Sequence, residues 1–474
     1  MAVRYKKFGN KNYAYEIWNE KDNTTGKWRQ RSRYLGVVVD EEQGKYEKRN
    51  KIKQAARIAG QKEQKILDYG DAYFFNEFLK NDPLLPVLRA TFGDSADTLL
   101  SLALYKLQGG GAMRHAEVWY DGNAASILFP DAAMASQSIS GFLDAIGKER
   151  LQRGFSQSYI KSVCSDRTGL IIDSTGLENQ INMPITAWGY HNGGIEMETR
   201  LILAVAKESK MPLYFRYVAG NIGDVSTLTT TISELKKIGV VPTISIIDAG
   251  YYSEGNIKAL YEGNVSFLTR LPSGRVVYKS LIKENHGGIE SKENAVAYGE
   301  RGLFIKKAKI DLYGHPAFAY VVCDPVRRGR EISKKILESG LKDDDFGLQN
   351  CGMMALVSNE DIDKKEIIPL FYSRQMAEQL FGIAKDDLNI LPLRIHSESR
   401  FRGLLMLSFI ALILYLKIKS ALGTAATVEQ VLNLMRNLKC KVYDDNSFIV
   451  SEVNKKQRLA FESLNFLVPK NCGV

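Results

Sequence analysis

Two short apolar runs, each followed by an aspartate, constrain the fold of this 474-residue chain most strongly. The runs are Leu170–Asp173 (LIID) and Ile244–Asp248 (ISIID), and turn-forming residues follow both of them. Short apolar runs between turn formers are typical of strands buried on both faces. We therefore expect two buried strands, each ending where its acid appears, with both carboxylates held in place by a sheet. Either aspartate alone is also compatible with a helix cap or a turn residue.

A third segment, Phe371–Lys385, carries charged residues at helical spacing. At about 100° per residue, Phe371, Arg374, Glu378 and Lys385 fall within an arc of about 60°. The apolar residues on the opposite face are Met376, Leu380, Ile383 and Ala384. This pattern predicts a helix that packs on a core and holds Glu378 outward between two cations, an arrangement suited to a metal ion beside phosphates. An ordinary amphipathic helix with an Arg/Glu pair is the alternative.

Together, the three blocks resemble the DDE transposases of bacterial insertion sequences, in the group whose last block is the YREK signature. That signature is Tyr, two residues, Arg, three residues, Glu, six residues and Lys. Arg374, Glu378 and Lys385 match it, and Phe371 stands at the Tyr position. The other matching blocks are IIDSTG at 171–176, PLYFRYVAGNIGD at 212–224 and IIDAGYYSEGN at 246–256. The resemblance covers residues 165 to 420 approximately.

The resemblance implies an α/β fold with an RNase H-like catalytic core, as in retroviral integrases. Local patterns agree with it. Thr199–Ala206 and Leu213–Val218 are rich in β-branched and aromatic residues, so they continue a meander from the first strand. Val225–Ile238 then predicts a helix, with Asp224 as its N-cap. The order of three strands, a helix and a further strand bearing an acid is the order that such a core requires.

The gap between Asp248 and Glu378 is too long for a loop within a compact core. It contains strand-like runs at Arg275–Tyr278, Gly302–Ile310 and Ala317–Cys323. We therefore predict a mainly β insertion with one polar helix around Glu331–Ser339, and the resemblance also implies a β-rich insertion before the glutamate helix.

The length of the chain favours several domains, because single cores rarely exceed about 250 to 300 residues. Helical spacing at Asp97–Leu107 and Gln137–Ile146 predicts a helical layer. Near the C-terminus, Thr427–Gln430 resembles a capping box at the start of a helix that ends at Leu438. A hairpin at Lys441–Val450 is expected to follow. The predicted domains are a basic N-terminal DNA-binding module at 1–70, a helical domain at 71–164, the first part of the core at 165–272, the insertion at 273–365, the second part of the core with the Glu378 helix at 366–420, and a C-terminal helix and hairpin at 421–474.

Positive charge is concentrated at the N-terminus. Residues 1–67 contain 17 Lys or Arg against 8 Asp or Glu, whereas the whole chain carries a net charge of +10. Expected strands at Tyr13–Trp18 and Trp28–Val39 flank a turn at 22–26, and Glu42–Lys65 is expected to be a polar helix or linker. The cations among the aromatic residues, Lys27, Arg29, Arg31 and Arg33, suit a surface that contacts DNA phosphates. A solvated charged hairpin is the alternative.

The resemblance implies metal-dependent DNA chemistry. Asp173, Asp248 and Glu378 are the expected catalytic residues and ligands of two Mg²⁺ ions, for which Mn²⁺ can substitute, with Asp173 as the bridging ligand. Arg374 and Lys385 are expected to hold phosphates near the scissile bond. His396, Arg400 and Arg402 either extend that track or are surface charge. The implied partners are double-stranded DNA, as terminal inverted repeats and as target, and a second copy of the chain in a homodimer on DNA.

The cysteines and the apolar segments bear on where the chain works. Its five cysteines are dispersed without metal-ligand spacing, which favours a reducing cytoplasm, here bacterial and nucleoid-associated. The start of the sequence lacks a signal-peptide pattern, and the apolar run Leu404–Leu416 is too short to cross about 30 Å of hydrocarbon, so we expect a core helix and no membrane partner. Two other functions remain open: a transposase-derived DNA-binding protein without activity, and an RNase H-like nuclease that cuts without joining.

Overall fold

The structure is a computed structural model of residues 1–474, and it describes residues 2–8, 11–21, 28–40, 44–47, 63–163, 167–191, 194–339, 345–445 and 447–469. The chain divides into two compact units. The smaller unit contains residues 1–67, 439–453 and 469–474, and the larger unit contains residues 68–438 and 454–468. The predicted C-terminal module at 421–474 is therefore shared between the two units.

The smaller unit contains two sheets. The first has the strand order β1-β2-β3-β4, with β1 at Ala2–Phe8, β2 at Lys11–Lys21, β3 at Trp28–Asp40 and β4 at Lys45–Glu47. The second has the order β17-β16-β5, with β5 at Glu63–Asp68, β16 at Lys439–Tyr443 and β17 at Phe448–Val450. The two N-terminal strands and the C-terminal hairpin are confirmed, and the turn at 22–26 lies outside the described residues. Of the expected polar helix or linker at 42–65, only 44–47 and 63–65 are described, as a turn residue and strands, and the remainder lies outside the described residues.

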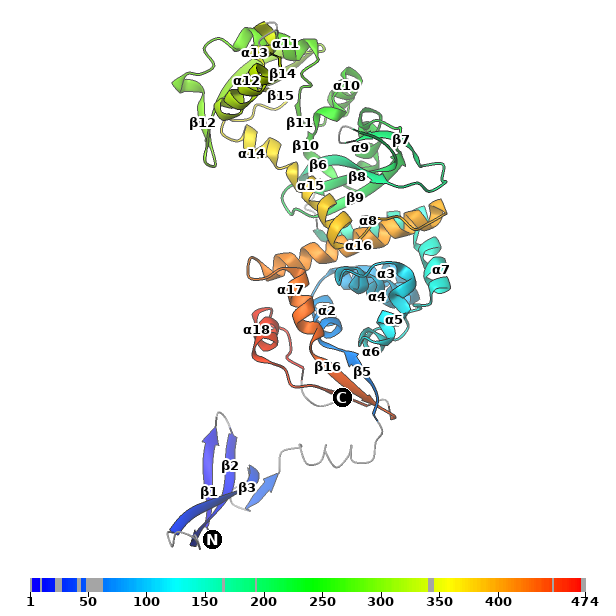
Figure 1. The fold of residues 1–474 in the computed structure, drawn as a ribbon, viewed down its shortest axis with the longest axis vertical. Helices are drawn as coiled ribbons and strands as arrows, with labels where there is room; N and C mark the ends of the chain where they lie inside the picture. The colour runs from blue at the N-terminus through cyan, green and yellow to red at the C-terminus, as the bar shows by residue number, and fades with distance from the viewer. Residues whose placement is uncertain are drawn as a thin grey trace. The chain divides into compact units, whose positions relative to one another are not determined.

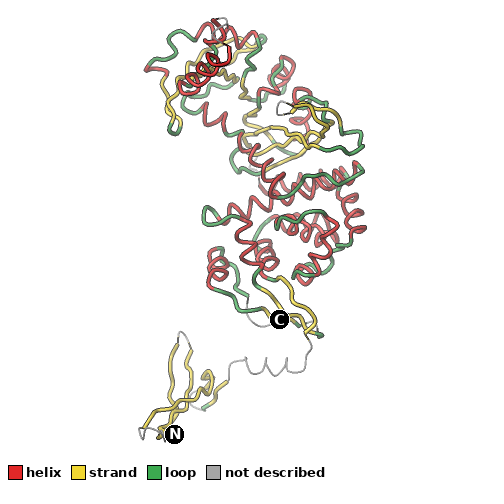
Figure 2. Tube along the Cα trace, viewed as in Figure 1, coloured by secondary structure: helices red, strands yellow, loops and turns green. Residues whose placement is uncertain are grey.

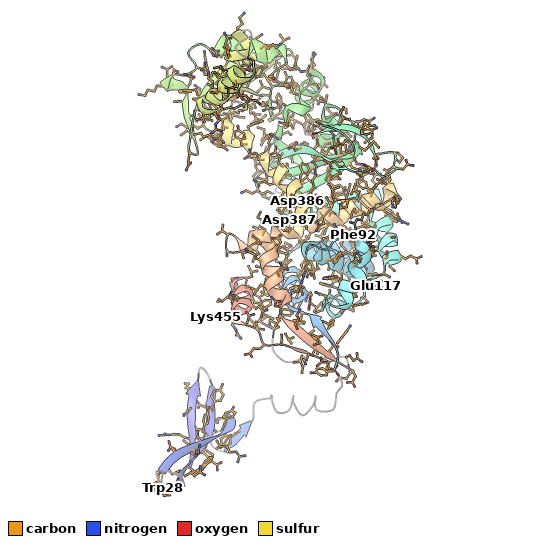
Figure 3. The ribbon with its side chains drawn as sticks, in the orientation of Figure 1. Trp28, Phe92, Glu117, Asp386, Asp387 and Lys455 are labelled. Carbon is orange, nitrogen blue, oxygen red and sulfur yellow. The ribbon has the colours of Figure 1, made fainter. Side chains whose placement is uncertain are left out.

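Trp28 begins β3 and is 69% exposed. Figure 3 labels it at one end of the N-terminal sheet.

The larger unit is built on one ten-stranded sheet. Its order is β12-β13-β14-β15-β11-β10-β6-β8-β7, and β9 pairs with β8 on the same side as β7. The strands are β6 at Arg167–Glu178, β7 at Ala187–His191, β8 at Gly194–Ala206, β9 at Pro212–Ala219, β10 at Val241–Ile247, β11 at Phe267–Arg270, β12 at Ala295–Tyr298, β13 at Arg301–Leu312, β14 at His315–Cys323 and β15 at Met353–Ser358.

Half of this sheet, in the order β9-β8-β6-β10-β11, has the expected RNase H-like arrangement. β6, β8 and β9 form an antiparallel meander, whereas β10 and β11 run parallel to β6. Parallel neighbours need a crossover connection. α9 (Leu228–Lys237) and α10 (Glu254–Glu262) provide the two crossovers, and their apolar faces are buried in the core beside the sheet (Figure 1). The predicted α/β fold is confirmed.

The insertion differs from the prediction in its helix content. Its strand β15 pairs antiparallel with β11, so β12–β15 extend the sheet of the core. It also contains α11 (Val276–Asn285), α12 (Pro325–Ser339) and α13 (Asp345–Gln349), and the expected strand at Arg275–Tyr278 lies on α11. Tyr278, Leu281 and Ile282 are buried at helical spacing, which the short strand-like window did not reveal. The polar helix expected at 331–339 is confirmed as part of α12.

Below the sheet lies a helical layer, which Figure 2 shows in red. Its helices are α2 at Gly70–Lys80, α3 at Leu84–Phe92, α4 at Ala96–Leu107, α5 at Ala116–Asp121, α6 at Ala125–Leu128, α7 at Ser136–Ile146 and α8 at Glu149–Val163. α17 (Val428–Arg436) packs on α2, and α18 (Lys455–Ser463) packs on α17. Thr427 and Gln430 form the expected reciprocal capping box at the start of α17.

α16 (Glu398–Leu422) runs between the sheet and the helical layer (Figure 1). It packs on α4 and α7 on one side and on β9 on the other. Gly403 allows the close approach of α7, because a Cβ there would overlap the backbone carbonyl of Leu143. With 25 residues, α16 is the one described helix long and apolar enough to span a membrane, and 83% of its most apolar window is buried. The prediction of a helix too short to span was therefore wrong, and burial is what marks it as a core helix.

Candidate active site

Asp173 lies on β6, where the strand loses one of its two neighbours. The parallel pairing of β6 with β10 ends at Ile172 opposite Ile247. On the other side, β8 continues to pair with β6 as far as Glu178. The expectation that the strand ends at Asp173 was therefore wrong, because β6 stays paired with β8 for five more residues and ends at Glu178. Asp173 is therefore the first residue of β6 beyond its pairing with β10.

Asp248 directly follows β10. Its backbone remains extended, with φ −76° and ψ 165°, and a short 3₁₀ turn begins at Ala249. Because β6 and β10 are parallel neighbours, their corresponding ends meet at the same edge of the sheet. The two aspartates are thus brought together by the pairing of two strands.

Glu378 lies on α15 (Gln375–Gly382), which packs on β6 and β8. The predicted single helix is in fact three pieces: α14 (Ile367–Tyr372), α15 and the π-helical turn η6 (Ile383–Asp387), whose Asp386 and Asp387 are labelled in Figure 3.

Burial along this segment corrects one further expectation. Ala377, Leu380 and Phe381 are buried, and the Glu378 side chain is 52% exposed, as its outward position requires. Phe371 was expected on the charged face but is only 2% exposed, because the break after α14 rotates it into the core.

The guanidinium of Arg374 holds the three acids together. Its Nη1 is 2.9 Å from Glu378 Oε1 and 3.4 Å from Asp173 Oδ2, and its Nε is 3.5 Å from Asp248 Oδ1. The Cζ atom of Arg374 lies 5.7 Å from the centroid of the Phe371 ring. This cation–π contact helps to orient the guanidinium. Residues far apart in the sequence therefore converge on one cation.

Burial raises the pKa of Asp173 to about 7. The backbone N–H of Ser174 and the charge of Arg374 lower that pKa, whereas the charges of Asp248 and Glu378 raise it. Asp248 Oδ1 is buried and accepts no hydrogen bond within the described part of the chain. Among the described residues, the cation close to this oxygen is Arg374, whose Nε is 3.5 Å away. Asp173 is thus largely shielded from solvent and Asp248 keeps one buried oxygen without a donor, so an additional cation would be stabilised beside them.

The acids fit divalent ions by their chemistry, but Arg374 lies in the space between them. In the described ranges, no group of three acidic or imidazole side chains is close enough to bind one ion. Carboxylate oxygens are the ligands that Mg²⁺ and Mn²⁺ prefer, and Asp248 offers an oxygen without a donor. Ion binding here requires Arg374 to leave its present position and the carboxylates to move closer together.

Lys385 contacts the strand of Asp173 rather than the acids. Its Nζ donates a 2.8 Å hydrogen bond to Thr175 Oγ1, two residues from Asp173 on the same face of β6. Burial lowers the pKa of Lys385, and nearby carboxylates oppose that shift. Lys385 itself lies on the π-helical turn η6 rather than on a regular α-helix.

A charged network on the opposite face of β6 was missed by the sequence analysis. Asp224 Oδ1 accepts hydrogen bonds from Ser174 Oγ at 2.6 Å and from Arg200 Nη1 at 3.0 Å. Arg200 Nη2 also donates to Glu198 Oε1 at 3.1 Å, and Glu198 is 1% exposed. Asp224 is therefore not the predicted N-cap: it starts a 3₁₀ turn, and the residue before α9 makes no side-chain cap.

The same network explains the glycine of the IIDSTG block. The Glu198 carboxylate occupies the place that a Cβ at Gly176 would need. A charged pair, Glu198 and Arg200, inside an otherwise apolar strand was the available sequence signal for this network.

The remaining predicted DNA-binding residues lie in several places. His396 and Arg400 line a cavity below the sheet, whereas Arg402 bonds the Tyr217 hydroxyl and Glu398. Arg31 and Arg33 are exposed on β3, and Arg31 pairs with Glu20.

Lys27 and the side chain of Arg29 lie outside the described residues. A DNA-contacting role for all of these cations stays a prediction.

The raised pKa of Asp173 predicts an effect on stability without metal. The folded state holds the Asp173 proton up to about pH 7, whereas the unfolded state loses it near its ordinary value of about 3.9. The contribution of the Asp173 carboxyl to the free energy of unfolding therefore falls as the pH rises from about 4 to 7. We expect Asp173→Asn to raise the free energy of unfolding in EDTA by about 1–2 kcal/mol at pH 8 and little at pH 5.

Urea unfolding of both proteins at the two pH values measures this difference. A variant that is less stable than the wild type at pH 8 would contradict it.

The chain is similar to a family of known proteins and to solved structures. Residues 165–414 match a family described as "Transposase DDE domain". A piggyBac transposase synaptic complex with hairpin DNA is similar at 10% identity and a TM-score of 0.43, covering 77% of this chain and 79% of that chain. The Drosophila P element transposase strand transfer complex is similar at 12% identity and a TM-score of 0.23, covering 69% and 80%. No curated protein matches the chain.

Proposed function

Because the match over residues 165–414 spans more than half of its length, the chain belongs to the Transposase DDE domain family, and we propose that it binds the ends of an insertion sequence, cuts them by Mg²⁺-dependent hydrolysis and joins the freed 3′-OH ends to target DNA. One observation carries this proposal: Asp173, Asp248 and Glu378 surround a single cation, the Arg374 guanidinium. Carboxylates grouped in this way serve phosphodiester chemistry with divalent ions.

Bound divalent ions would activate the attacking oxygen and stabilise the leaving oxygen of an in-line displacement. Asp173, Asp248 and Glu378 would hold them, with Asp173 between the other two. Asp173 must lose its proton to do so. Arg374, once displaced from the acids, presents a planar fork of donors that matches a phosphate. Lys385, held by Thr175 on the same face, provides a second positive charge for the strand.

The proposed reaction consists of two successive displacements. In the first, a water oxygen attacks the phosphorus at the transposon end, the bond to the 3′ oxygen breaks, and that oxygen leaves as a hydroxyl. In the second, this hydroxyl attacks a phosphodiester of the target, whose own 3′ oxygen leaves. No side chain becomes covalently attached, so the acids return unchanged. We extend the proposal to a homodimer that holds two ends together on DNA.

A strand-transfer assay with a pre-cleaved end, taken from the DNA that borders the reading frame, tests this proposal. We expect joined products with Mg²⁺ or Mn²⁺ and none in EDTA. Cleavage of an uncut end without any joining would indicate a nuclease, and binding without cleavage in either metal would indicate an inactive DNA-binding protein. Short inverted repeats flanked by a direct duplication would identify the element as an insertion sequence.

The pKa of Asp173 also predicts the pH dependence of cleavage. Because the pKa of this carboxyl is about 7, the ionised fraction falls about tenfold for each pH unit below it. Cleavage should therefore rise with pH and level off above pH 7. Metal ions compete with the proton for the carboxylate, so raising the Mg²⁺ concentration should move the midpoint to lower pH. A midpoint that does not respond to Mg²⁺ would assign the titration to another group.

A further inference from the structure

A cavity of about 430 Å³ lies beside the segment that continues from the Glu378 helix. Its walls come from α4 and α7 of the helical layer, from residues 111–114, and from residues 389–396 that lead into α16. Residue 389 follows η6 almost directly, so the main chain runs from Glu378 through Lys385 into the wall of this cavity. All of these elements belong to the larger unit.

The walls combine apolar side chains with cations. Ile139, Leu143 and Leu404 provide apolar surface, and Lys106, Arg114, Arg394 and Arg400 provide charge. None of the residues that line the cavity is Asp or Glu. Among the described residues, the one carboxylate paired with a lining cation is Asp144, whose Oδ2 is 2.9 Å from Arg400 Nε. The side chains that line the cavity therefore carry a net positive charge.

Lys106 is the most unusual of these cations. It is 1% exposed, and its Nζ donates a 3.0 Å hydrogen bond to the backbone carbonyl of Leu388. No carboxylate within the described ranges pairs with it. Burial lowers its pKa to about 8. A buried ammonium without an anion is costly, and an anion entering the cavity would remove that cost.

We propose that this cavity binds one nucleotide of a DNA strand, with its base against Ile139, Leu143 and Leu404 and its phosphate near Lys106 and Arg394. Flat apolar surface suits the face of a base, and cations suit the phosphate. The nucleotide comes from a single-stranded or frayed part of the DNA, because unstacking costs least there. This inference rests on the proposed function, since it adds a strand-holding site to the unit that carries the three acids.

The test measures binding apart from cutting. Fluorescence anisotropy in EDTA follows a labelled five-residue oligothymidylate, with an abasic strand of equal length, thymidine monophosphate and inorganic phosphate as competitors. We expect Arg394→Ala to weaken binding of the oligothymidylate about tenfold. Ser140→Trp, which fills the cavity without removing a cation, should have a similar effect. Arg458→Ala, at an exposed arginine on α18, is the matched control and should bind as the wild type does.

Outcomes separate this inference from the proposed function. Wild-type affinity in both Arg394→Ala and Ser140→Trp overturns the cavity proposal, whether or not the protein cuts DNA. An abasic strand that competes as well as the oligothymidylate overturns the base contact, and competition by phosphate or thymidine monophosphate at equal concentration overturns a DNA site in favour of a small-anion site. A cavity-dependent affinity in a protein that joins no DNA ends supports the cavity proposal and contradicts only the proposed function.

Discussion

Replacing Glu378 with Gln is expected to reduce DNA cleavage by on the order of 10³-fold or more while leaving the binding of DNA ends unchanged. Glutamine keeps the size of the side chain but removes the negative charge that would hold a divalent ion. Losing several kcal/mol of stabilisation of transition-state charge corresponds to a rate loss of that size. The fold should tolerate the change, because the Glu378 side chain is 52% exposed.

Cleavage and end binding measured on the same preparation test this expectation. Asp386→Asn is the matched control, since Asp386, labelled in Figure 3, is exposed on the turn that follows α15 and is not one of the three acids that surround Arg374. That variant should cut at the wild-type rate. Loss of binding together with loss of cutting in Glu378→Gln would assign Glu378 to folding instead of catalysis.

Replacing Arg200 with Met is expected to lower the free energy of unfolding by about 3–5 kcal/mol, because it leaves a buried charge without its partner. Glu198 is 1% exposed and has Arg200 as its ion-pair partner, at 3.1 Å. Asp224 loses its 3.0 Å contact with Arg200 as well. The network touches Ser174, next to Asp173, so cleavage should fall together with stability.

Urea unfolding measures this loss, and the slope of the unfolding free energy against urea concentration should stay unchanged. Arg89→Met is the matched control, because Arg89 is 52% exposed and its pair with Asp97 should contribute less than about 1 kcal/mol. The double variant Glu198→Gln, Arg200→Met should recover part of the stability, since the buried side chain at 198 then carries no charge that needs the Arg200 partner. A loss below about 1 kcal/mol in Arg200→Met would show that solvent reaches Glu198.

The parts of the site that follow local periodicity could be predicted from the sequence. The strands before Asp173 and Asp248 were visible as apolar runs, and Glu378 was visible as an outward residue between apolar positions. The structure brings their side chains around Arg374 because β6 and β10 are parallel neighbours and α15 packs on β6. The meander and the capping box at Thr427 were predictable for the same reason, since both depend on neighbouring residues.

Features that depend on distant contacts could not be predicted. β6 continues past Asp173 because β8 pairs with it, and α11 forms because Tyr278 and Ile282 are buried against strands more than thirty residues away in sequence. Lys106 sits in an apolar helix, and only the fold shows that its ammonium faces Leu388 and a cavity. Local spacing also could not show that α15 is preceded by a break and followed by a π-helical turn.

Iron-directed cleavage of the protein backbone tests the central claim most directly, because it needs no DNA. Fe²⁺ binds the oxygen and nitrogen sites of other divalent ions, and with peroxide it cuts the chain next to where it is bound. We predict fragments that end near Asp173, Asp248 and Glu378 together, suppressed by excess Mg²⁺ and lost in Glu378→Gln. Cuts confined to one of the three segments, or cuts that Mg²⁺ does not suppress, would contradict a shared ion site.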